Sequence, residues 1–284
     1  MTVQRRAPRR PLSSSGGPRR GRPARRIGLA LAGGGPLGAI YEIGALCALE
    51  EAIPGLRLNA MRGYVGVSAG AIVAAGLANG MTARQLCAAF IENDASAGSA
   101  ASDDISPMLF VQPALAEYAQ RLATLPRLAA TAGVRMLRRA LPGRARRGGA
   151  TVAGALESLG SALPTGLFSN APLQARLAEI FSRAGRSDDF RALAHRLVLV
   201  ATDLDSGESA PFGAPGWDEV PISVAATASA ALPGLFPPVE IGGRFYVDGA
   251  LKKTLHARVL LDEGLDLVFC LNPLVPFDAQ HAPR

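Results

Sequence analysis

The sequence has few cysteines, almost no lysine and no long apolar run, and these shortages exclude several classes of protein. Its three cysteines, Cys47, Cys87 and Cys270, lie far apart and lack the spacing of a zinc site or a disulfide framework. They predict reduced, buried thiols, so we expect a cytoplasmic protein without a metal centre. The most apolar stretch, residues 65–78, is shorter than the roughly 20 residues that cross a bilayer.

Acidic residues are missing from residues 1–26, which contain nine arginines. The rest of the chain holds 21 basic and 23 acidic residues, so this segment accounts for the formal net charge of +7. No apolar stretch follows the arginines, as a signal peptide requires, and four prolines argue against the amphipathic helix of a transit peptide. We expect a disordered Arg-rich tail. Lysine is scarce throughout the chain, so a general preference for arginine over lysine can account for the arginine-rich tail without an anionic ligand. No nucleic acid is expected as a partner.

Two strand–turn–helix units open the ordered part of the chain. A buried strand at 27–32 leads through a glycine loop to a helix at 40–53, and a strand at 62–67 turns at Ser68 into a helix at 69–78. Such units build a parallel sheet with helices on its faces, so we expect an α/β fold. Further along, we expect helices at 173–183 (capped by Ser169 or Asn170), 220–231 and 254–263, strands at 197–202 and 265–271, and a hairpin over 239–247.

Residues 95–165 differ in composition from the segments on either side. They mix small residues and prolines with short helical stretches, and residues 118–156 contain eight arginines but no acid. We expect a helical, lid-like insertion whose apolar face, Val134, Leu137 and Leu141, either meets a membrane surface or belongs to a solvated lid. We therefore divide the chain into the tail at 1–26, a folded domain at 27–271, and a C-terminal extension at 272–284 that fits a natural end or a shortened chain equally.

The motif with the clearest chemical meaning is a G-x-S-x-G sequence, Gly66 to Gly70, between an expected strand and helix. A serine that projects from a sheet on a tight, strained turn leaves no room for side chains two residues away, so Gly66 and Gly70 suit these positions. The helix that begins after Ser68 directs its positive end toward a reacting oxygen. We expect Ser68 to be a nucleophile; the alternative is a small-residue turn that only permits close helix packing.

A second glycine-rich turn, G-G-G-P-L-G at residues 33–38, lies between the first strand and the first helix. Its backbone N–H groups suit an oxyanion hole. The same residues also satisfy G-x-G-x-x-G, a dinucleotide-binding pattern that requires an acidic residue about 20 positions later, at the end of the next strand. Here the next strand ends in the G-x-S-x-G turn. We expect no dinucleotide cofactor and assign the oxyanion hole to Gly33, Gly34, Gly35 and Gly38.

Asp248 follows the expected strand at 245–247 and begins a turn with Gly249 and Ala250. A serine nucleophile needs a base to accept its proton, and a carboxylate at the end of a strand can approach the G-x-S-x-G turn. Taken alone, Asp-Gly is a common turn sequence. Because the other two motifs are also present, we expect Asp248 to be the base for Ser68 and Gly249 to be a required turn glycine.

The three motifs, in this order, resemble the patatin-like phospholipase family, and the resemblance extends over most of residues 27–271. Residues 201–208 and 228–239 also look like core segments of this family. The resemblance implies a three-layer α/β/α domain with a mainly parallel central sheet. It also implies a serine acyl hydrolase without a cofactor, in which a dyad of Ser68 and Asp248 cleaves fatty-acyl esters of lipids or phospholipids through an acyl-enzyme. The expected partner is a lipid or a membrane surface, to which the protein would bind peripherally.

Two positions depart from the family pattern. The family usually has Arg or Lys immediately before the last glycine of its first motif, where this chain has Leu37. It often has Asn-x-Pro after the aspartate motif, where this chain has Lys252, Lys253 and Thr254. These differences bear on rate and substrate more than on the class of enzyme.

Two other functions remain open from the sequence. An α/β-hydrolase triad could be formed by Ser68, by Asp203 or Asp205, and by His256, although that fold usually places more strands before its serine. A catalytically silent family member would bind lipid or act as a scaffold without hydrolysing an ester.

Overall fold

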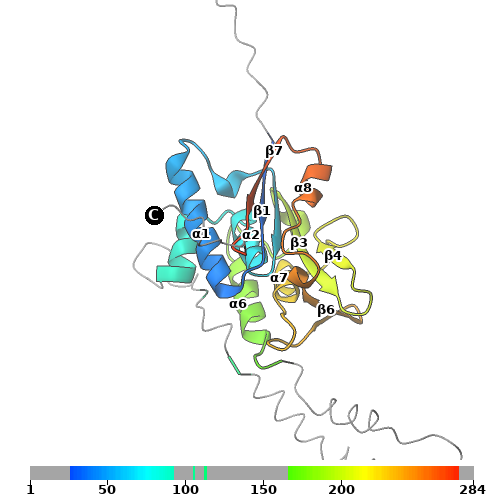
Figure 1. The fold of residues 1–284 in the computed structure, drawn as a ribbon. Coiled ribbons are helices and arrows are strands. Elements are labelled where there is room, and N and C mark those ends of the chain that lie inside the picture. Colours follow the sequence, from blue (N-terminus) through cyan, green and yellow to red (C-terminus); the bar gives the residue numbers. More distant parts are fainter. Residues whose placement is uncertain (1–25, 93–104, 106–111, 114–165, 275–284) are drawn as a thin grey trace, which may run out of the picture.

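The structure is a computed structural model that describes residues 26–92, 105, 112–113 and 166–274 (Figure 1). The expected tail, except its last residue, lies outside the described residues. So do most of the expected insertion, with its apolar face at 134–141, and the end of the C-terminal extension. No helix in the described part of the chain is long and apolar enough to span a membrane.

A seven-stranded sheet forms the centre of the domain. Four strands are parallel, in the spatial order β3 (Arg196–Asp203), β2 (Gly63–Val67), β1 (Ile27–Leu31) and β7 (Leu267–Leu271). Three strands are antiparallel to their neighbours, namely β4 (Ser209–Phe212), β5 (Val239–Ile241) and β6 (Arg244–Asp248). The sheet is thus mainly parallel, as expected, and β2 is buried along its whole length because both of its faces are covered.

Helices cover both faces of the sheet (Figure 1). On one face, β3 presents Leu197 and Leu199 to the larger hydrophobic core. On the other face, Val198 and Val200 pack with Leu260 in a smaller cluster. The expected three-layer α/β/α arrangement is therefore confirmed, with one thick and one thin helical layer. The thick layer contains α1 (Gly35–Ala52), α2 (Ala69–Ala78), α3 (Ala83–Cys87), α6 (Ala171–Phe181) and α7 (Ile222–Ser229), and the thin layer contains α8 (Arg258–Asp262).

Most expected elements are confirmed, with differences at their ends. The hairpin forms β5 and β6. Helix α1 begins before the expected residue 40, because Pro36 suits the first turn of a helix, and α8 is shorter than the expected helix. Two further elements are not expected from the sequence: β4, and α3, which Thr82 and Gln85 cap reciprocally. Short turns at η1 (Leu58–Ala60), η2 (Ala88–Glu92), η4 (Phe190–Ala192) and η5 (Gly249–Leu251) complete the described elements.

The start of α6 differs from the expected capping arrangement. The Asn170 side chain does not cap the helix but donates to the Pro237 carbonyl at 2.6 Å, which ties the helix start to the segment before β5. The Ser169 hydroxyl instead accepts the N–H of Ala171 at 3.2 Å. Asn170 thus occupies the N-cap position without capping the helix through its side chain, which satisfies a distant carbonyl, so the expected side-chain cap is not formed there.

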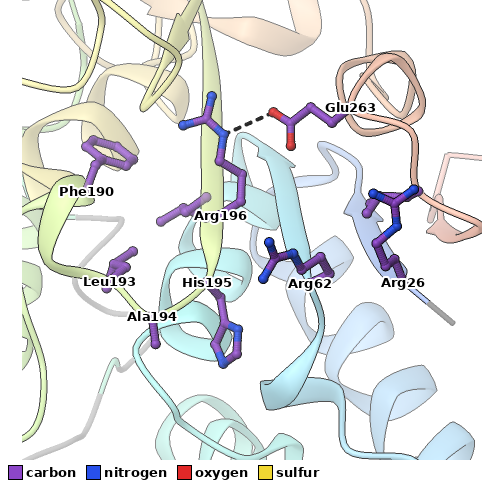
Figure 2. Close-up of a pocket in the computed structure, with 10 residues that line it drawn as sticks. Arg26, Arg62, Phe190, Leu193, Ala194, His195, Arg196 and Glu263 are labelled. Atoms are coloured by element: carbon purple, nitrogen blue, oxygen red, sulfur yellow. Dashed lines mark hydrogen bonds and ion pairs between the residues drawn. The ribbon is translucent and has the colours of Figure 1, made fainter. Parts of the chain in front are cut away.

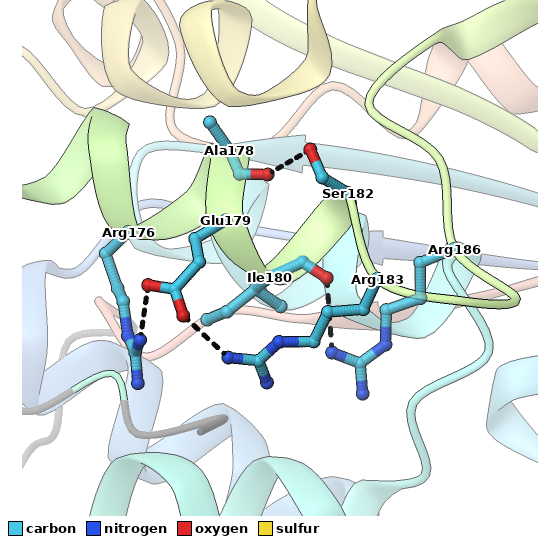
Figure 3. Close-up of polar contacts among 7 residues, drawn as sticks. All are labelled: Arg176, Ala178, Glu179, Ile180, Ser182, Arg183 and Arg186. Atoms are coloured by element: carbon cyan, nitrogen blue, oxygen red, sulfur yellow. Dashed lines mark hydrogen bonds and ion pairs between the residues drawn. The ribbon is translucent and has the colours of Figure 1, made fainter.

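The outer face of α6 carries a small ion-pair network (Figure 3). The Glu179 carboxylate pairs with Arg176 at 2.6 Å and with Arg183 at 3.1 Å. The hydrogen bond from Arg176, and then that from Arg183, holds the pKa of Glu179 below its usual value. Because Glu179 is exposed to solvent, these pairs contribute little to stability. The helix is held mainly by its buried face, which includes Leu177 and Ile180.

Candidate active site

Ser68 lies at the turn between β2 and α2, called the elbow below, where its backbone has φ 54° and ψ −124°. It is the one residue other than glycine with a positive φ in the described part of the chain. A side chain in this conformation is strained, and such strain persists where the surrounding structure enforces it. Ser68 is also buried, and α2 begins at the next residue, so the unpaired N–H groups of its first turn start beside the hydroxyl.

The glycines on either side of the elbow have no space for a side chain. A Cβ on Gly66 would lie 2.4 Å from the Gly70 carbonyl oxygen, and a Cβ on Gly70 would lie 2.5 Å from the Ala32 carbonyl oxygen. Both clashes are with backbone, which cannot move aside as a side chain can. The two glycines therefore allow α2 to begin in direct contact with the ends of β1 and β2.

The sheet register explains how Asp248 reaches Ser68 across 180 positions of sequence. At Val200, β3 is flanked by β4 on one edge and by Val67 of β2 on the other. At Ala201, the next residue, it is flanked by β4 and by Asp248 of β6. β2 and β6 therefore lie along the same edge of β3 and meet end to end. The residue after β2 and the last residue of β6 come together at that junction.

The Ser68 and Asp248 side chains are in direct contact. The Ser68 hydroxyl donates to Asp248 Oδ2 at 2.7 Å, and both side chains are buried. The other carboxylate oxygen, Oδ1, accepts the Ala250 N–H at 2.8 Å, which fixes the orientation of the group. Burial raises the pKa of Asp248 above its usual value, and the hydrogen bonds from Ser68 and Ala250 oppose this rise. A carboxylate with a raised pKa holds a proton more readily and is a stronger base.

Gly249 permits the close approach of the two strand ends. A Cβ at this position would lie 2.1 Å from the Val200 carbonyl oxygen and 3.1 Å from the Val67 side chain. The Thr202 hydroxyl also donates to the Asp248 carbonyl at 3.2 Å. β3 therefore stabilises this turn by a side-chain hydrogen bond as well as by its backbone pairing with β6. A larger residue than glycine would separate β6 from the elbow.

The glycine loop at 33–38 contacts both of the other motifs. A Cβ on Gly33 would lie 2.9 Å from the Ala250 side chain, 3.2 Å from Ser68 Cβ and 3.9 Å from Ser68 Oγ. The loop thus passes directly against the elbow and the aspartate turn. Three segments that are far apart in sequence surround one hydroxyl.

Two of the four glycines expected to stabilise an oxyanion already use their N–H groups. Gly33 donates to the Thr254 carbonyl at 3.1 Å, and Gly38 donates to the Gly34 carbonyl at 3.0 Å. The N–H groups of Gly34 and Gly35 make no hydrogen bond within the described residues. Gly34 precedes α1 and Gly35 is its first residue, so the positive end of the helix dipole adds to both. In this loop, Gly34 and Gly35 are therefore the remaining candidates for N–H donors to an oxyanion.

Ser229, which the motifs do not include, connects the elbow to β3. Its hydroxyl accepts the Ser68 N–H at 2.9 Å and donates to the Val200 carbonyl at 2.6 Å, and the side chain is fully buried. The Ser68 N–H and the Val200 carbonyl lie where the pairing of β2 with β3 ends, so they need a hydrogen-bond partner outside these two strands. The signal for Ser229 in the sequence was its place in the segment 228–239, which resembles the family core.

A second residue outside the motifs, Glu42 of α1, holds the start of the glycine loop. Glu42 is fully buried, and its Oε1 accepts the Ala32 N–H at 2.8 Å. Burial raises the pKa of Glu42 to about 9, against the opposing effect of this hydrogen bond, so the group is protonated at neutral pH. Its Oε2 has no hydrogen-bond partner among the described residues.

The triad considered as an alternative is not assembled. Asp203 pairs with Arg244 at 3.0 Å and accepts the Asp205 N–H at 3.0 Å. His256 Nε2 is buried and has no hydrogen-bond partner in the described part of the chain. Neither of the two candidate carboxylates is hydrogen-bonded to the imidazole, and the elbow hydroxyl is engaged by a different carboxylate.

The positions that depart from the family pattern lie beside the site. Leu37 is 80% exposed in the first turn of α1, next to the glycine loop. Lys252 follows η5 and pairs with Glu208 at 2.6 Å, which links the turn after Asp248 to the loop before β4. Among the described residues, no group of three or more His, Cys, Asp or Glu side chains is placed to hold a metal ion.

Comparison with known proteins identifies the family. The sequence model described as patatin-like phospholipase matches residues 29–261, which include all three motifs. The chain belongs to the patatin-like phospholipase family. Its mixed α/β architecture with a mainly parallel sheet is consistent with the patatin-like fold, and the family as a whole is one of lipid hydrolases.

Three solved structures similar to this patatin-like chain are considerably longer than it. VipD from Legionella pneumophila has 20% sequence identity and a TM-score of 0.44, with 87% of this chain and 49% of that chain covered. The type III effector protein ExoU has 25% identity and a TM-score of 0.34, with 72% and 40% covered. ExoU from Pseudomonas aeruginosa in complex with SpcU has 24% identity and a TM-score of 0.30, with 72% and 37% covered. The chain thus spans about half the length of VipD and less of ExoU.

Proposed function

We propose that this patatin-like protein is a serine acyl hydrolase that cleaves fatty-acyl ester bonds of lipids and phospholipids, with Ser68 as nucleophile and Asp248 as base. The observation that carries the proposal is the 2.7 Å hydrogen bond from the Ser68 hydroxyl to Asp248 at a buried, strained turn. Family membership supports lipid hydrolysis as the class of reaction.

In the acylation step, Ser68 Oγ attacks the carbonyl carbon of the ester while its proton passes to Asp248 Oδ2. The carbonyl oxygen becomes an oxyanion, which accepts hydrogen bonds from the N–H groups of Gly34 and Gly35. A donor fixed at this position lowers the barrier by roughly 3–4 kcal/mol. When the intermediate collapses, the ester C–O bond breaks, the leaving alcohol takes the proton from Asp248, and the acyl group remains on Ser68.

In the deacylation step, water attacks the acyl carbonyl and gives one proton to Asp248. The same N–H groups stabilise the second oxyanion. Collapse then breaks the bond to Ser68 Oγ, which recovers the proton from Asp248, and the fatty acid is released. The carboxylate alternates between base and acid, so the cycle needs no second titratable side chain.

The environment of Asp248 compensates for the weakness of a carboxylate as a base. Burial destabilises its charged form and raises its pKa toward that of the group it must deprotonate. Two hydrogen bonds, from Ser68 and Ala250, keep the group oriented while it is desolvated. The rest of the barrier reduction must come from the oxyanion donors and from the fixed position of the hydroxyl.

A fluorophosphonate probe combined with lipid analysis tests this function. We expect the wild-type chain to be labelled and to release fatty acid from at least one lipid in a panel analysed by mass spectrometry, and Ser68→Ala to lose both properties. His256→Ala should retain labelling. A wild-type chain that is neither labelled nor active on any lipid would contradict the proposal and fit a catalytically silent family member, and labelling that persists in Ser68→Ala would rule out this nucleophile.

A further inference from the structure

A cavity of about 370 Å³ lies at the opposite end of the sheet from Ser68. Three neighbouring parallel strands each contribute an arginine to it: Arg26 precedes β1, Arg62 precedes β2 and Arg196 begins β3 (Figure 2). Because β1, β2 and β3 are adjacent in the sheet, the three cationic side chains gather along one edge. Three positive charges on one lining favour an anion there.

The two outer arginines have acidic neighbours, whereas the central one does not. Arg196 pairs with Glu263 at 3.0 Å, and Arg26 lies 4.0 Å from Asp266. The Arg62 guanidinium makes no hydrogen bond or ion pair with any residue that the structure describes. Among the described residues that line the cavity, three are arginines and one, Glu263, is acidic, so with neutral histidine their net formal charge is +2, which Asp266 beside Arg26 reduces to +1.

The backbone fixes Arg62 between its neighbours. Its N–H donates to the Ile27 carbonyl at 2.8 Å, and its carbonyl accepts the Arg196 N–H at 3.4 Å. Figure 2 shows its guanidinium directed toward β3, between the Arg196 side chain above and the His195 ring below. The His195 ring is itself placed by an edge-on contact with Tyr64, at 6.3 Å between ring centroids. The central cation is thus presented to the cavity by a rigid part of the fold.

We propose that this cavity binds a phosphate group, carried by a soluble phosphate ester or by the headgroup of an anionic lipid. Arg62 is the principal ligand, because a guanidinium can donate two parallel hydrogen bonds to phosphate oxygens. Arg196 and His195 also line the cavity, and the negative charge of a phosphate would balance the charge of Arg62. Apolar side chains of Phe190 and Leu265 form part of the wall and suit the carbon portion of such a ligand.

This pocket is separate from the proposed hydrolase site. Arg62 and Ser68 lie beyond opposite ends of β2. At about 3.3 Å per residue, the strand separates them by roughly 20 Å. A phosphate bound at Arg62 therefore does not belong to a lipid whose ester lies at Ser68. Phosphate binding at Arg62 does not depend on whether Ser68 is a nucleophile.

Calorimetric titration of the full chain with inorganic phosphate, at constant ionic strength, tests the site. We expect saturable binding that Arg62→Gln weakens by about tenfold or more, because the bidentate contact is lost. Arg57→Gln is the matched control: it removes the same charge nearby in sequence but outside the cavity, and should leave binding unchanged. Turnover of a soluble ester should be the same in Arg62→Gln as in the wild type.

Vesicle sedimentation distinguishes the two sources of phosphate, with the Ser68→Ala chain used to prevent lipid cleavage. A lipid headgroup is identified if the Ser68→Ala chain binds phosphatidylcholine vesicles that contain phosphatidic acid. The double variant that also carries Arg62→Gln should then lose this binding. Phosphate binding without such vesicle binding would identify a soluble ester. The proposal is overturned if neither phosphate nor phosphatidic acid is bound, or if Arg57→Gln weakens binding as much as Arg62→Gln.

Discussion

At the scale of single residues, two central groups of the site oppose folding. Ser68 adopts a strained backbone conformation, and the charged form of Asp248 is destabilised by burial, as its raised pKa indicates. Neighbouring hydrogen bonds offset these costs. Ala250 holds the carboxylate, and the Ser229 hydroxyl satisfies the Ser68 N–H and the Val200 carbonyl together. We regard Ser229 as a positioning residue for the elbow.

Ser229→Ala tests this role. The change leaves a buried donor and a buried acceptor without a partner, so we expect a loss of about 1–3 kcal/mol in the free energy of unfolding. Because the elbow is then less well held, kcat on a soluble ester should fall roughly 10- to 100-fold with little change in KM. Chemical denaturation and steady-state kinetics measure the two effects.

Ser223→Ala is the matched control for Ser229→Ala. Ser223 is also buried in α7, and its hydroxyl donates to Asp188 at 2.7 Å, far from the elbow in the hydrogen-bond network. It should lose similar stability but keep its kcat. Equal losses of kcat in both variants would mean that Ser229 acts only through general stability.

At the scale of elements, the glycine loop depends on the helix that follows it. The proposed oxyanion donors lie at the start of α1, Gly34 just before the helix and Gly35 as its first residue. Glu42, further along the same helix, accepts the Ala32 N–H just after the end of β1. Helical periodicity alone did not show that an acidic residue points into the core. The structure shows a buried carboxyl that joins β1 to α1 beneath the loop, and its raised pKa favours the neutral form.

Glu42→Gln tests the protonation state of this carboxyl. The folded-state pKa is about 9 against an ordinary value of 4.5, so the folded protein keeps a proton that the unfolded chain releases. Wild-type stability from this group is complete below the ordinary value and falls as pH rises toward about 9, by at most about 1.4 kcal/mol per pH unit. Glutamine imitates the neutral acid and does not titrate.

We therefore expect the unfolding free energy of Glu42→Gln, relative to wild type, to increase steadily between pH 5 and pH 8 in denaturation series. Comparing the two chains at each pH cancels the contribution of the other titrating groups. A difference that stays constant across this range would mean that Glu42 is ionised in the folded protein.

At the scale of the whole molecule, the sequence predicted the parts of the site better than their assembly. The glycines at 66 and 70 marked a strained turn, and the order of motifs indicated the family. Nothing local revealed that β2 and β6 would lie on the same edge of β3, because register depends on pairing between distant strands. Ser229 and Glu42 were missed for a similar reason: each acts through a tertiary hydrogen bond that leaves no periodic pattern.

The rate of fluorophosphonate labelling as a function of pH, in the wild type and in Asp248→Asn, tests the central claim most directly. Only the ionised carboxylate accepts the Ser68 proton, so wild-type labelling should increase as pH rises through a pKa above the usual range of aspartate. In Asp248→Asn, the labelling rate should fall by roughly 100-fold or more, and it should lose that pH dependence. Labelling of Asp248→Asn at the wild-type rate, with the same pH profile, would contradict the account.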